Sequence, residues 1–354
     1  MPALILVAAV QAAPVFLDRE ATIDKACTLV DEAARQGASL VVFPEAFVPG
    51  YPEWVWRTPA WRDGSLYRRL WDQSVSLDDG ATRRIGEAAA AAGAWVAVGV
   101  NERDGASATL YNTLLYFSPD GSLAGSHRKL MPTGGERTVW GTGDGSSLTV
   151  CDAGFGRVGG LICWENYMPL ARAAMYAQGV EIFLAPTWDG SDAWVATLRH
   201  IAKEGRVYVI GTNICMRGSD IAQDVPRRDD LWGGEDDWLS RGNTAIVGPD
   251  GGILAGPLRE QEGILYAELD MERLQTQRRE FDPVGHYARP DVFRLEVDVT
   301  PRTPVTFAPF VHERGEHRAV AGGTQDDRSR SYTVAMAEAE GIEPTRPLAK
   351  PHRY

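Results

Sequence analysis

The feature that most constrains the fold of this chain is an alternation of short apolar runs with amphipathic helical segments. Residues 4–12 form a continuous apolar run of strand length. Residues 18–36 follow with apolar side chains at helical spacing and end at Gly37. A second apolar run, residues 39–43, comes next. Strands that alternate with helices predict an α/β fold with a mixed sheet.

The same alternation continues to about residue 280. Two turn sequences, SPDG at 118–121 and PDGG at 249–252, predict hairpins. One strand ends VVFPE and another ends FLAP, which suggests two related sheets. We expect strands at 95–100, 110–117, 123 onward, 148–151, 157–163, 181–186, 207–214, the hairpin 244–258 and 264–269, with helices at 82–92, 168–178, 191–204 and 271–279.

Composition excludes several classes of partner. The chain has 354 residues, with 36 Lys and Arg against 48 Asp and Glu, so its formal net charge is −12. Nucleic acids and anionic membranes both require a basic surface, so neither is expected to bind. The apolar run at the N-terminus is short and lacks a basic flank, which favours a buried strand over a signal peptide. No run approaches the ~20 apolar residues of a membrane-spanning helix.

The four cysteines are sparse and form no Cys-x-x-Cys pair; they are Cys27, Cys151, Cys163 and Cys215. This pattern indicates neither a disulfide framework nor a zinc ribbon, and it fits a reducing cytoplasm. We therefore expect a cytoplasmic protein without a metal site.

The C-terminal part differs in character from the rest. We expect one domain over residues 1–300 and an extension over 301–354, which is rich in Glu, Arg, Gly, Ser and Pro. Composition leaves two interpretations open, a disordered tail or an arm that packs on a neighbouring subunit.

Cys163 is the candidate nucleophile among the cysteines. It follows the apolar run VGGLI at 158–162 and precedes the polar and aromatic segment WENYMP at 164–169. A strand that stops before a helix presents its last side chain at the edge of the sheet, where α/β proteins place their sites. A helix N-terminus also lowers a thiol pKa and offers N–H groups to a developing anion. The alternative is a structural cysteine at a strand end.

Three charged residues are candidate partners of the thiol. Glu45 follows the buried run VVFP, where burial raises a carboxyl pKa toward the range of a general base. Lys129 has apolar neighbours in HRKLMP, so we expect it to point inward, pair with carboxylates and stabilise negative charge. Glu136 lies seven residues on and supplies a second carboxylate. The alternatives are an exposed loop glutamate and a solvated lysine.

Aromatic residues near these segments indicate an apolar pocket. Tyr51, Trp140, Trp164 and Trp188 are candidate substrate-binding residues, although aromatic residues also occur as plain core. An aromatic lining favours aromatic or arylaliphatic substrates over small polar ones.

At these residues the chain resembles the nitrilase superfamily of carbon–nitrogen hydrolases. The resemblance rests on three segments in order: VVFPEAFVPGYP around Glu45, HRKLMPTGGERTVWGTGDGS around Lys129 and GGLICWENYMPLAR around Cys163. It extends to about residue 290, and the CWEN sequence is closest to the nitrilase branch. The resemblance implies a four-layer αββα sandwich, a Glu45–Lys129–Cys163 triad assisted by Glu136, no metal and no organic cofactor. It also implies a homo-oligomer, a dimer or a spiral built from dimers.

The implied activity is hydrolysis of an organic nitrile to a carboxylic acid and ammonia through a thioimidate and a thioester on cysteine. An aliphatic amidase, a carbamoylase and a cyanide hydratase or dihydratase share the triad and stay open as alternatives. A non-catalytic assembling subunit is a further alternative, although it has no need for all three triad residues.

Overall fold

The computed structural model describes residues 4–105, 107–234, 236–303 and 305. Met1–Thr303 form one compact unit. The C-terminal extension expected after residue 300 lies almost wholly outside the described residues.

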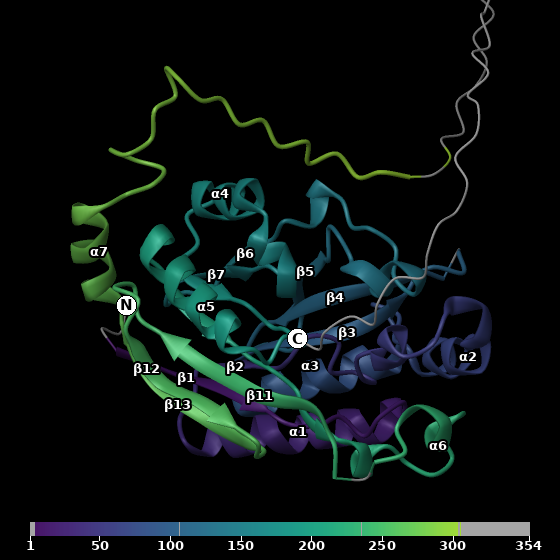
Figure 1. Cartoon of the computed structure of the whole chain (residues 1–354). Coiled ribbons are helices and arrows are strands. Elements are labelled where there is room, and N and C mark those ends of the chain that lie inside the picture. Colours follow the sequence, from purple (N-terminus) through teal and green to yellow (C-terminus); the bar gives the residue numbers. More distant parts are fainter. Residues whose placement is uncertain (1–3, 106, 235, 304, 306–354) are drawn as a thin grey trace, which may run out of the picture. The chain divides into compact units, whose positions relative to one another are not determined.

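The compact unit contains two β-sheets and helices (Figure 1). The helices are α1 (Arg19–Arg35), α2 (Gly64–Gln73), α3 (Gly80–Ala92), α4 (Pro169–Ala177), α5 (Asp192–Gly205), α6 (Arg228–Leu231) and α7 (Met271–Glu280). The strands are β1 (Leu4–Gln11), β2 (Leu40–Val42), β3 (Trp95–Arg103), β4 (Leu110–Phe117), β5 (Leu123–Arg128), β6 (Val150–Asp152), β7 (Arg157–Gly160), β8 (Ile182–Leu184), β9 (Tyr208–Gly211), β10 (Cys215–Arg217), β11 (Trp238–Val247), β12 (Ile253–Arg259) and β13 (Gly263–Asp270).

Both sheets are mixed. The first has the strand order β13-β1-β2-β3-β4-β5, and the second has the order β10-β11-β9-β8-β7-β6 with β12 paired to β11. Strands β1, β2 and β3 are parallel neighbours, as are β7, β8 and β9. The remaining strands pair in antiparallel fashion around these parallel centres. The predicted mixed α/β fold is therefore confirmed.

Burial divides the unit into four layers. In β1, Val7 and Ala9 face the core between the two sheets, while Ala8 and Val10 face the cluster that includes α1 and α3. In the second sheet, Ile182 and Leu184 face the same central core, and Phe183 packs with α4 and α5. This alternation follows from the two-residue period of a strand. The αββα sandwich implied by the resemblance is confirmed.

Two parts of the sequence prediction are incomplete or wrong. Helix α2 and the short elements α6 and β10 were not expected, although Leu66, Tyr67, Leu70 and Trp71 give α2 an apolar stripe at helical spacing that was a usable signal. The strand expected over 157–163 ends at Gly160, and Cys163–Tyr167 form a 3₁₀ helix instead.

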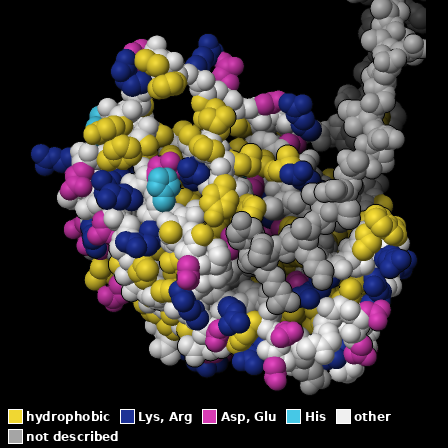
Figure 2. Space-filling model, viewed as in Figure 1, with side chains coloured by type: hydrophobic (Ala, Val, Ile, Leu, Met, Phe, Trp, Pro, Cys, Tyr) yellow, Lys and Arg dark blue, Asp and Glu magenta, His cyan; other side chains and the backbone are white. Residues whose placement is uncertain are grey.

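The surface carries charges of both signs. On the face shown in Figure 2, Lys and Arg side chains are interspersed with Asp and Glu and with hydrophobic side chains. No helix among the described residues is long and apolar enough to span a membrane.

The loop after β2 approaches β3 so closely that β3 needs a glycine there. A Cβ atom on Gly99 would lie 2.3 Å from the Pro44 carbonyl oxygen and 2.5 Å from the Ala46 nitrogen. Both atoms belong to backbone, which cannot move aside as a flexible side chain can. Gly99 therefore sets how deeply the Pro44–Ala46 segment, which carries Glu45, sits in the molecule.

We predict that Gly99→Ala lowers the free energy of unfolding by about 1–3 kcal/mol, as overpacking does elsewhere. Gly80→Ala is the matched control, because a Cβ there meets nothing within 4 Å at the first position of α3. Urea unfolding measures both. Equal stability of the two variants would contradict this account of the loop.

Candidate active site

Cys163 stands on a sharp turn between β7 and α4. Its φ is +54°, a left-handed conformation that is uncommon for a residue with a side chain. The turn is held by several hydrogen bonds. The Cys163 N–H donates to the Pro186 carbonyl over 2.8 Å, and the Asn166 amide donates to the carbonyls of Leu161 and Cys163 over 2.8 and 2.9 Å. A strained backbone conformation that several hydrogen bonds hold in place is typical of functional positions.

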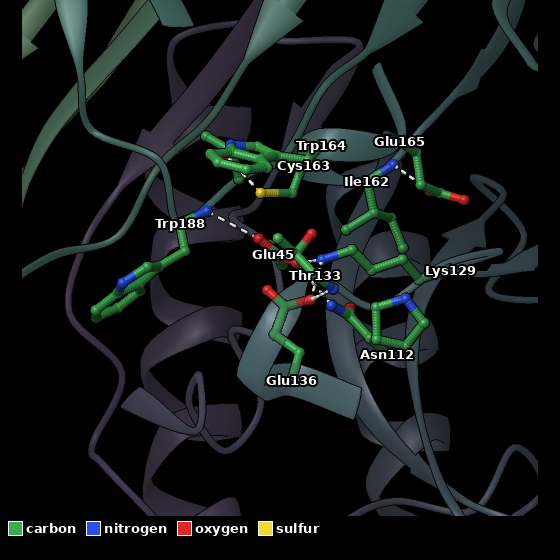
Figure 3. Close-up of polar contacts among 12 residues, drawn as sticks. Glu45, Asn112, Lys129, Thr133, Glu136, Ile162, Cys163, Trp164, Glu165 and Trp188 are labelled. Carbon is green, nitrogen blue, oxygen red and sulfur yellow. Dashed lines mark hydrogen bonds and ion pairs between the residues drawn. The ribbon is translucent and has the colours of Figure 1, made fainter. Parts of the chain in front are cut away.

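Glu45 is fully buried and accepts three hydrogen bonds. Its Oε1 accepts from the Lys129 ammonium and from the Asn112 amide, both over 2.7 Å, and its Oε2 accepts from the Trp188 N–H over 2.8 Å (Figure 3). A carboxylate offers about four acceptor positions. One position on Oε2 is therefore left for another proton donor.

Lys129 joins two carboxylates. It follows β5, and its buried Nζ donates over 2.7 Å both to Glu45 Oε1 and to Glu136 Oε2. Burial lowers the pKa of Lys129, but Glu45, Cys163 and Glu136 raise it, and the net pKa lies above its ordinary value. Lys129 is thus an ammonium with one N–H beyond these two bonds.

Glu136 is oriented by groups on three sides. Its Oε2 accepts from Lys129 and from the Thr133 N–H over 2.6 Å, and its Oε1 accepts from the Tyr51 hydroxyl over 2.7 Å. The Trp56 indole N–H donates in turn to the Tyr51 oxygen over 3.1 Å. These contacts fix the second carboxylate without using the free position on Glu45.

Glu45, Lys129, Glu136 and Cys163 form one buried array. It places an uncharged thiol beside a carboxyl group whose pKa is raised. Burial raises the pKa of Cys163, Glu45 raises it further, and Lys129 opposes both. The net pKa of Cys163 lies above its ordinary value, so it is not a thiol of lowered pKa as the position before a helix had suggested. Burial also raises the pKa of Glu45, Lys129 lowers it and Glu136 raises it, with a net upward shift.

The four predicted aromatic residues lie around this array, with different exposure. Tyr51 stacks on Trp188 with ring centroids 4.5 Å apart and meets Trp140 edge-on at 5.6 Å. Tyr51 and Trp140 are buried, and Trp140 donates to Asn101 over 2.8 Å. Trp164 is 48% exposed and donates to Asp189 over 2.9 Å.

Sequence reasoning missed two side chains that contact the candidate residues directly. The Thr187 hydroxyl donates to Cys163 Sγ over 3.1 Å, and Asn112 donates to Glu45. Thr187 directly follows the predicted strand 181–186, so the rule used for Cys163 applied to it as well. Asn112 is a polar residue inside the apolar strand LYNTLLYF, which was also a usable signal.

Among the described residues, no group of three or more His, Cys, Asp or Glu side chains is placed to hold a metal ion. All four cysteines are free thiols.

We predict that Lys129→Met lowers the free energy of unfolding by about 3–5 kcal/mol near pH 8, because it leaves two buried carboxylates without their cation. Burial raises the pKa of Glu45 in the folded state, and the variant removes Lys129, which lowers it. The folded state then binds more protons as the pH falls, so the loss should shrink toward pH ~5.5.

Urea unfolding at both pH values measures this loss. Lys203→Met, at an exposed position on α5, is the control and should show little loss at either pH. A loss for Lys129→Met that is the same at both pH values would rule out uncompensated carboxylates as its cause.

Known proteins share both the sequence and the fold of this chain. The family model described as carbon–nitrogen hydrolase matches residues 6–279. An aliphatic nitrilase of Sinorhizobium fredii (strain HH103) is 47% identical over 305 residues, which cover 84% of this chain and 97% of that protein. A bifunctional nitrilase/nitrile hydratase of Lupinus angustifolius is 41% identical, covering 84% of this chain and 87% of that protein.

The fold likeness extends to more distant proteins. The crystal structure of a carbon–nitrogen hydrolase from Helicobacter pylori G27 superposes with a TM-score of 0.65 at 24% identity, covering 82% of this chain and 97% of that one. The family match over most of the chain and the close relatives lead to one conclusion: this chain belongs to the carbon–nitrogen hydrolase family, the nitrilase superfamily.

Proposed function

We propose that this protein is a nitrilase that hydrolyses an organic nitrile to a carboxylic acid and ammonia through covalent intermediates on Cys163. The observation that carries the proposal is the buried array in which Lys129 bridges Glu45 and Glu136 beside an uncharged thiol. The relatives named nitrilases, at 40% identity and above, support the same activity.

The first step uses the free acceptor position of Glu45. Glu45 takes the thiol proton of Cys163, and the sulfur adds to the nitrile carbon. The raised pKa of Glu45 makes it a stronger base than an ordinary carboxylate, which eases the transfer. The hydroxyl of Thr187 stabilises negative charge on the sulfur. The proton then passes to the nitrile nitrogen, which gives a neutral thioimidate and restores the Glu45 carboxylate.

The later steps reuse the same groups. A water gives its proton through Glu45 to the imine nitrogen while its oxygen bonds to carbon, which forms a tetrahedral intermediate. The remaining N–H of Lys129 donates to the atom that gains negative charge. Transfer of the hydroxyl proton to the amine releases ammonia and leaves a thioester. A second water, activated in the same way, releases the acid and returns the proton to the sulfur.

We propose aromatic or arylaliphatic nitriles as the preferred substrates. Of the four candidate aromatic residues, Trp188 and Trp164 have exposed surface, and Trp188 also donates its backbone N–H to Glu45. Tyr51 and Trp140 would form the rigid support behind Trp188. Flat aromatic surfaces of this kind pack well against an aryl ring.

An amide is the second product that the same chemistry allows. The tetrahedral intermediate carries both an amine and a sulfur, and expulsion of the sulfur instead of ammonia gives the amide. The name of the Lupinus angustifolius relative, a bifunctional nitrilase/nitrile hydratase, supports this branch. Both branches need the same residues, so product analysis must distinguish them.

We also propose a cytoplasmic homo-oligomer. Exposed apolar side chains just before α4 and in its first turn support a contact between copies: Tyr167 is 45% exposed and Leu170 is 68% exposed. Four free cysteines are compatible with a reducing compartment.

We predict that the protein releases acid and ammonia from a panel of nitriles, with phenylacetonitrile, mandelonitrile and benzonitrile turned over faster than a short aliphatic nitrile or cyanide. Cys163→Ala should abolish turnover, because it removes the sulfur that bonds to the nitrile carbon. Glu45→Gln should fold and lose at least about a hundredfold in kcat, since it cannot accept the thiol proton. Ammonia release and chromatography of the acid and amide measure the outcome.

Cys151→Ala is the matched control, since Cys151 is a buried cysteine in the central core, and it should keep its activity. Turnover of the matching amides alone would replace the nitrilase assignment by an amidase. Activity in Cys163→Ala would remove that residue from the mechanism. A preference for the aliphatic nitrile would overturn the proposed substrate class and leave the reaction type intact.

A further inference from the structure

A buried ion pair lies beside the turn that carries Cys163. The proposed mechanism does not use it. His127 is in β5, two residues before Lys129, and Glu165 follows Cys163 by two residues. Both side chains are fully buried. His127 Nε2 lies 3.0 Å from Glu165 Oε2, and His127 Nδ1 lies 2.9 Å from the carbonyl oxygen of Ser147.

The hydrogen bonds of this pair determine where its protons are. A carbonyl oxygen only accepts, so Nδ1 carries a proton that it donates to Ser147. Glu165 accepts from backbone N–H groups over 2.6 and 2.7 Å, lengths typical of an ionised acceptor, so Glu165 is a carboxylate. Nε2 must then donate as well, which makes His127 an imidazolium. Burial lowers the pKa of His127, but Glu165 and the Ser147 carbonyl raise it, and its net direction is upward.

The carboxylate of Glu165 ties together the two segments that carry the reacting groups. Its Oε1 accepts from the N–H of Leu130, which directly follows Lys129. Its Oε2 accepts from the N–H of Ile162, which directly precedes Cys163 (Figure 3). The Glu165 carboxylate thus links the backbone next to Lys129 to the backbone next to Cys163.

We propose that Glu165, held as an anion by a doubly protonated His127, is a positioning residue that fixes Cys163 relative to Lys129 and Glu45. The proposal rests on the proposed nitrilase function for its kinetic consequence. The left-handed conformation of Cys163 needs support from its surroundings. Glu165 supplies it by linking the turn to the N–H of Leu130, just after β5. The N–H groups of Leu130 and Ile162 donate to different oxygens of Glu165. A glutamine at this position has only one acceptor oxygen, so one of the two N–H groups would lose its partner.

The test compares Glu165→Gln and His127→Gln with the control Arg128→Gln. Arg128 is also in β5 and forms a partly buried ion pair with Glu102, so the control removes an ion pair from the same strand without touching the nucleophile turn. We expect each test variant to lose about ten- to a hundredfold in kcat, the size of loss that misplacement by about an ångström causes, with KM within about threefold of wild type. Arg128→Gln should keep kcat within about twofold while losing stability.

Two further measurements separate positioning from folding. Thermal unfolding identifies the temperature above which each variant unfolds, and the kinetics are run below that temperature. If Glu165→Gln does not fold, His127→Gln alone provides the test. A long-range ¹⁵N–¹H spectrum of ¹⁵N-histidine-labelled wild type should show protons on both ring nitrogens of His127, assigned by their loss in His127→Gln. Only one protonated nitrogen would overturn the ion pair.

Wild-type kcat in both variants, or a loss no larger than that of Arg128→Gln, would overturn the positioning role. If the wild type turns over no nitrile, the proposed function fails, and the rate of Cys163 alkylation by iodoacetamide decides the inference instead. A change of about fivefold or more in both test variants, absent from Arg128→Gln, would then support positioning of the thiol. Unchanged alkylation would refute it.

Discussion

One interaction determines what the centre of this protein can do: the ammonium of Lys129 lies between two buried carboxylates, 2.7 Å from each. Burial makes each of these charges costly by itself, and their pairing offsets that cost. The arrangement keeps a base, a charge-stabilising donor and a thiol together in a buried site. Burial raises the pKa of the Cys163 thiol most, and the two carboxylates add to this effect, which favours the uncharged thiol.

The rest of the fold serves to hold these groups at fixed separations. Each comes from a segment that leaves a strand: Glu45 after β2, Lys129 after β5 and Cys163 after β7. Backbone contacts join the segments, with the Trp188 N–H on Glu45 and the Pro186 carbonyl on the Cys163 N–H. Because strands in two packed sheets move little, side chains at their ends gain a precision that free loops lack.

The sequence predicted most of the strands because they follow simple rules. Alternating apolar runs indicate the sandwich. The buried run before Glu45 and the apolar neighbours of Lys129 indicated these two residues, and the structure brings them into contact. The sequence failed where structure depends on distant partners. The apolar run VGGLI does not show that the chain leaves β7 at Gly160, because the turn is closed by Asn166 and by Pro186, which lies two residues after the end of β8. Nor does the sequence near Cys163 show that His127 and Glu165 meet, since they are 38 residues apart.

The central claim is that Cys163 becomes covalently linked to the substrate carbon within this array. The most direct measurement is acid quenching of the wild-type protein during turnover of a nitrile, followed by peptide mass spectrometry. The account predicts a substrate-derived acyl or imidoyl adduct on the peptide that contains Cys163, with Cys27, Cys151 and Cys215 unmodified. Sustained turnover with an adduct on a different residue would contradict it.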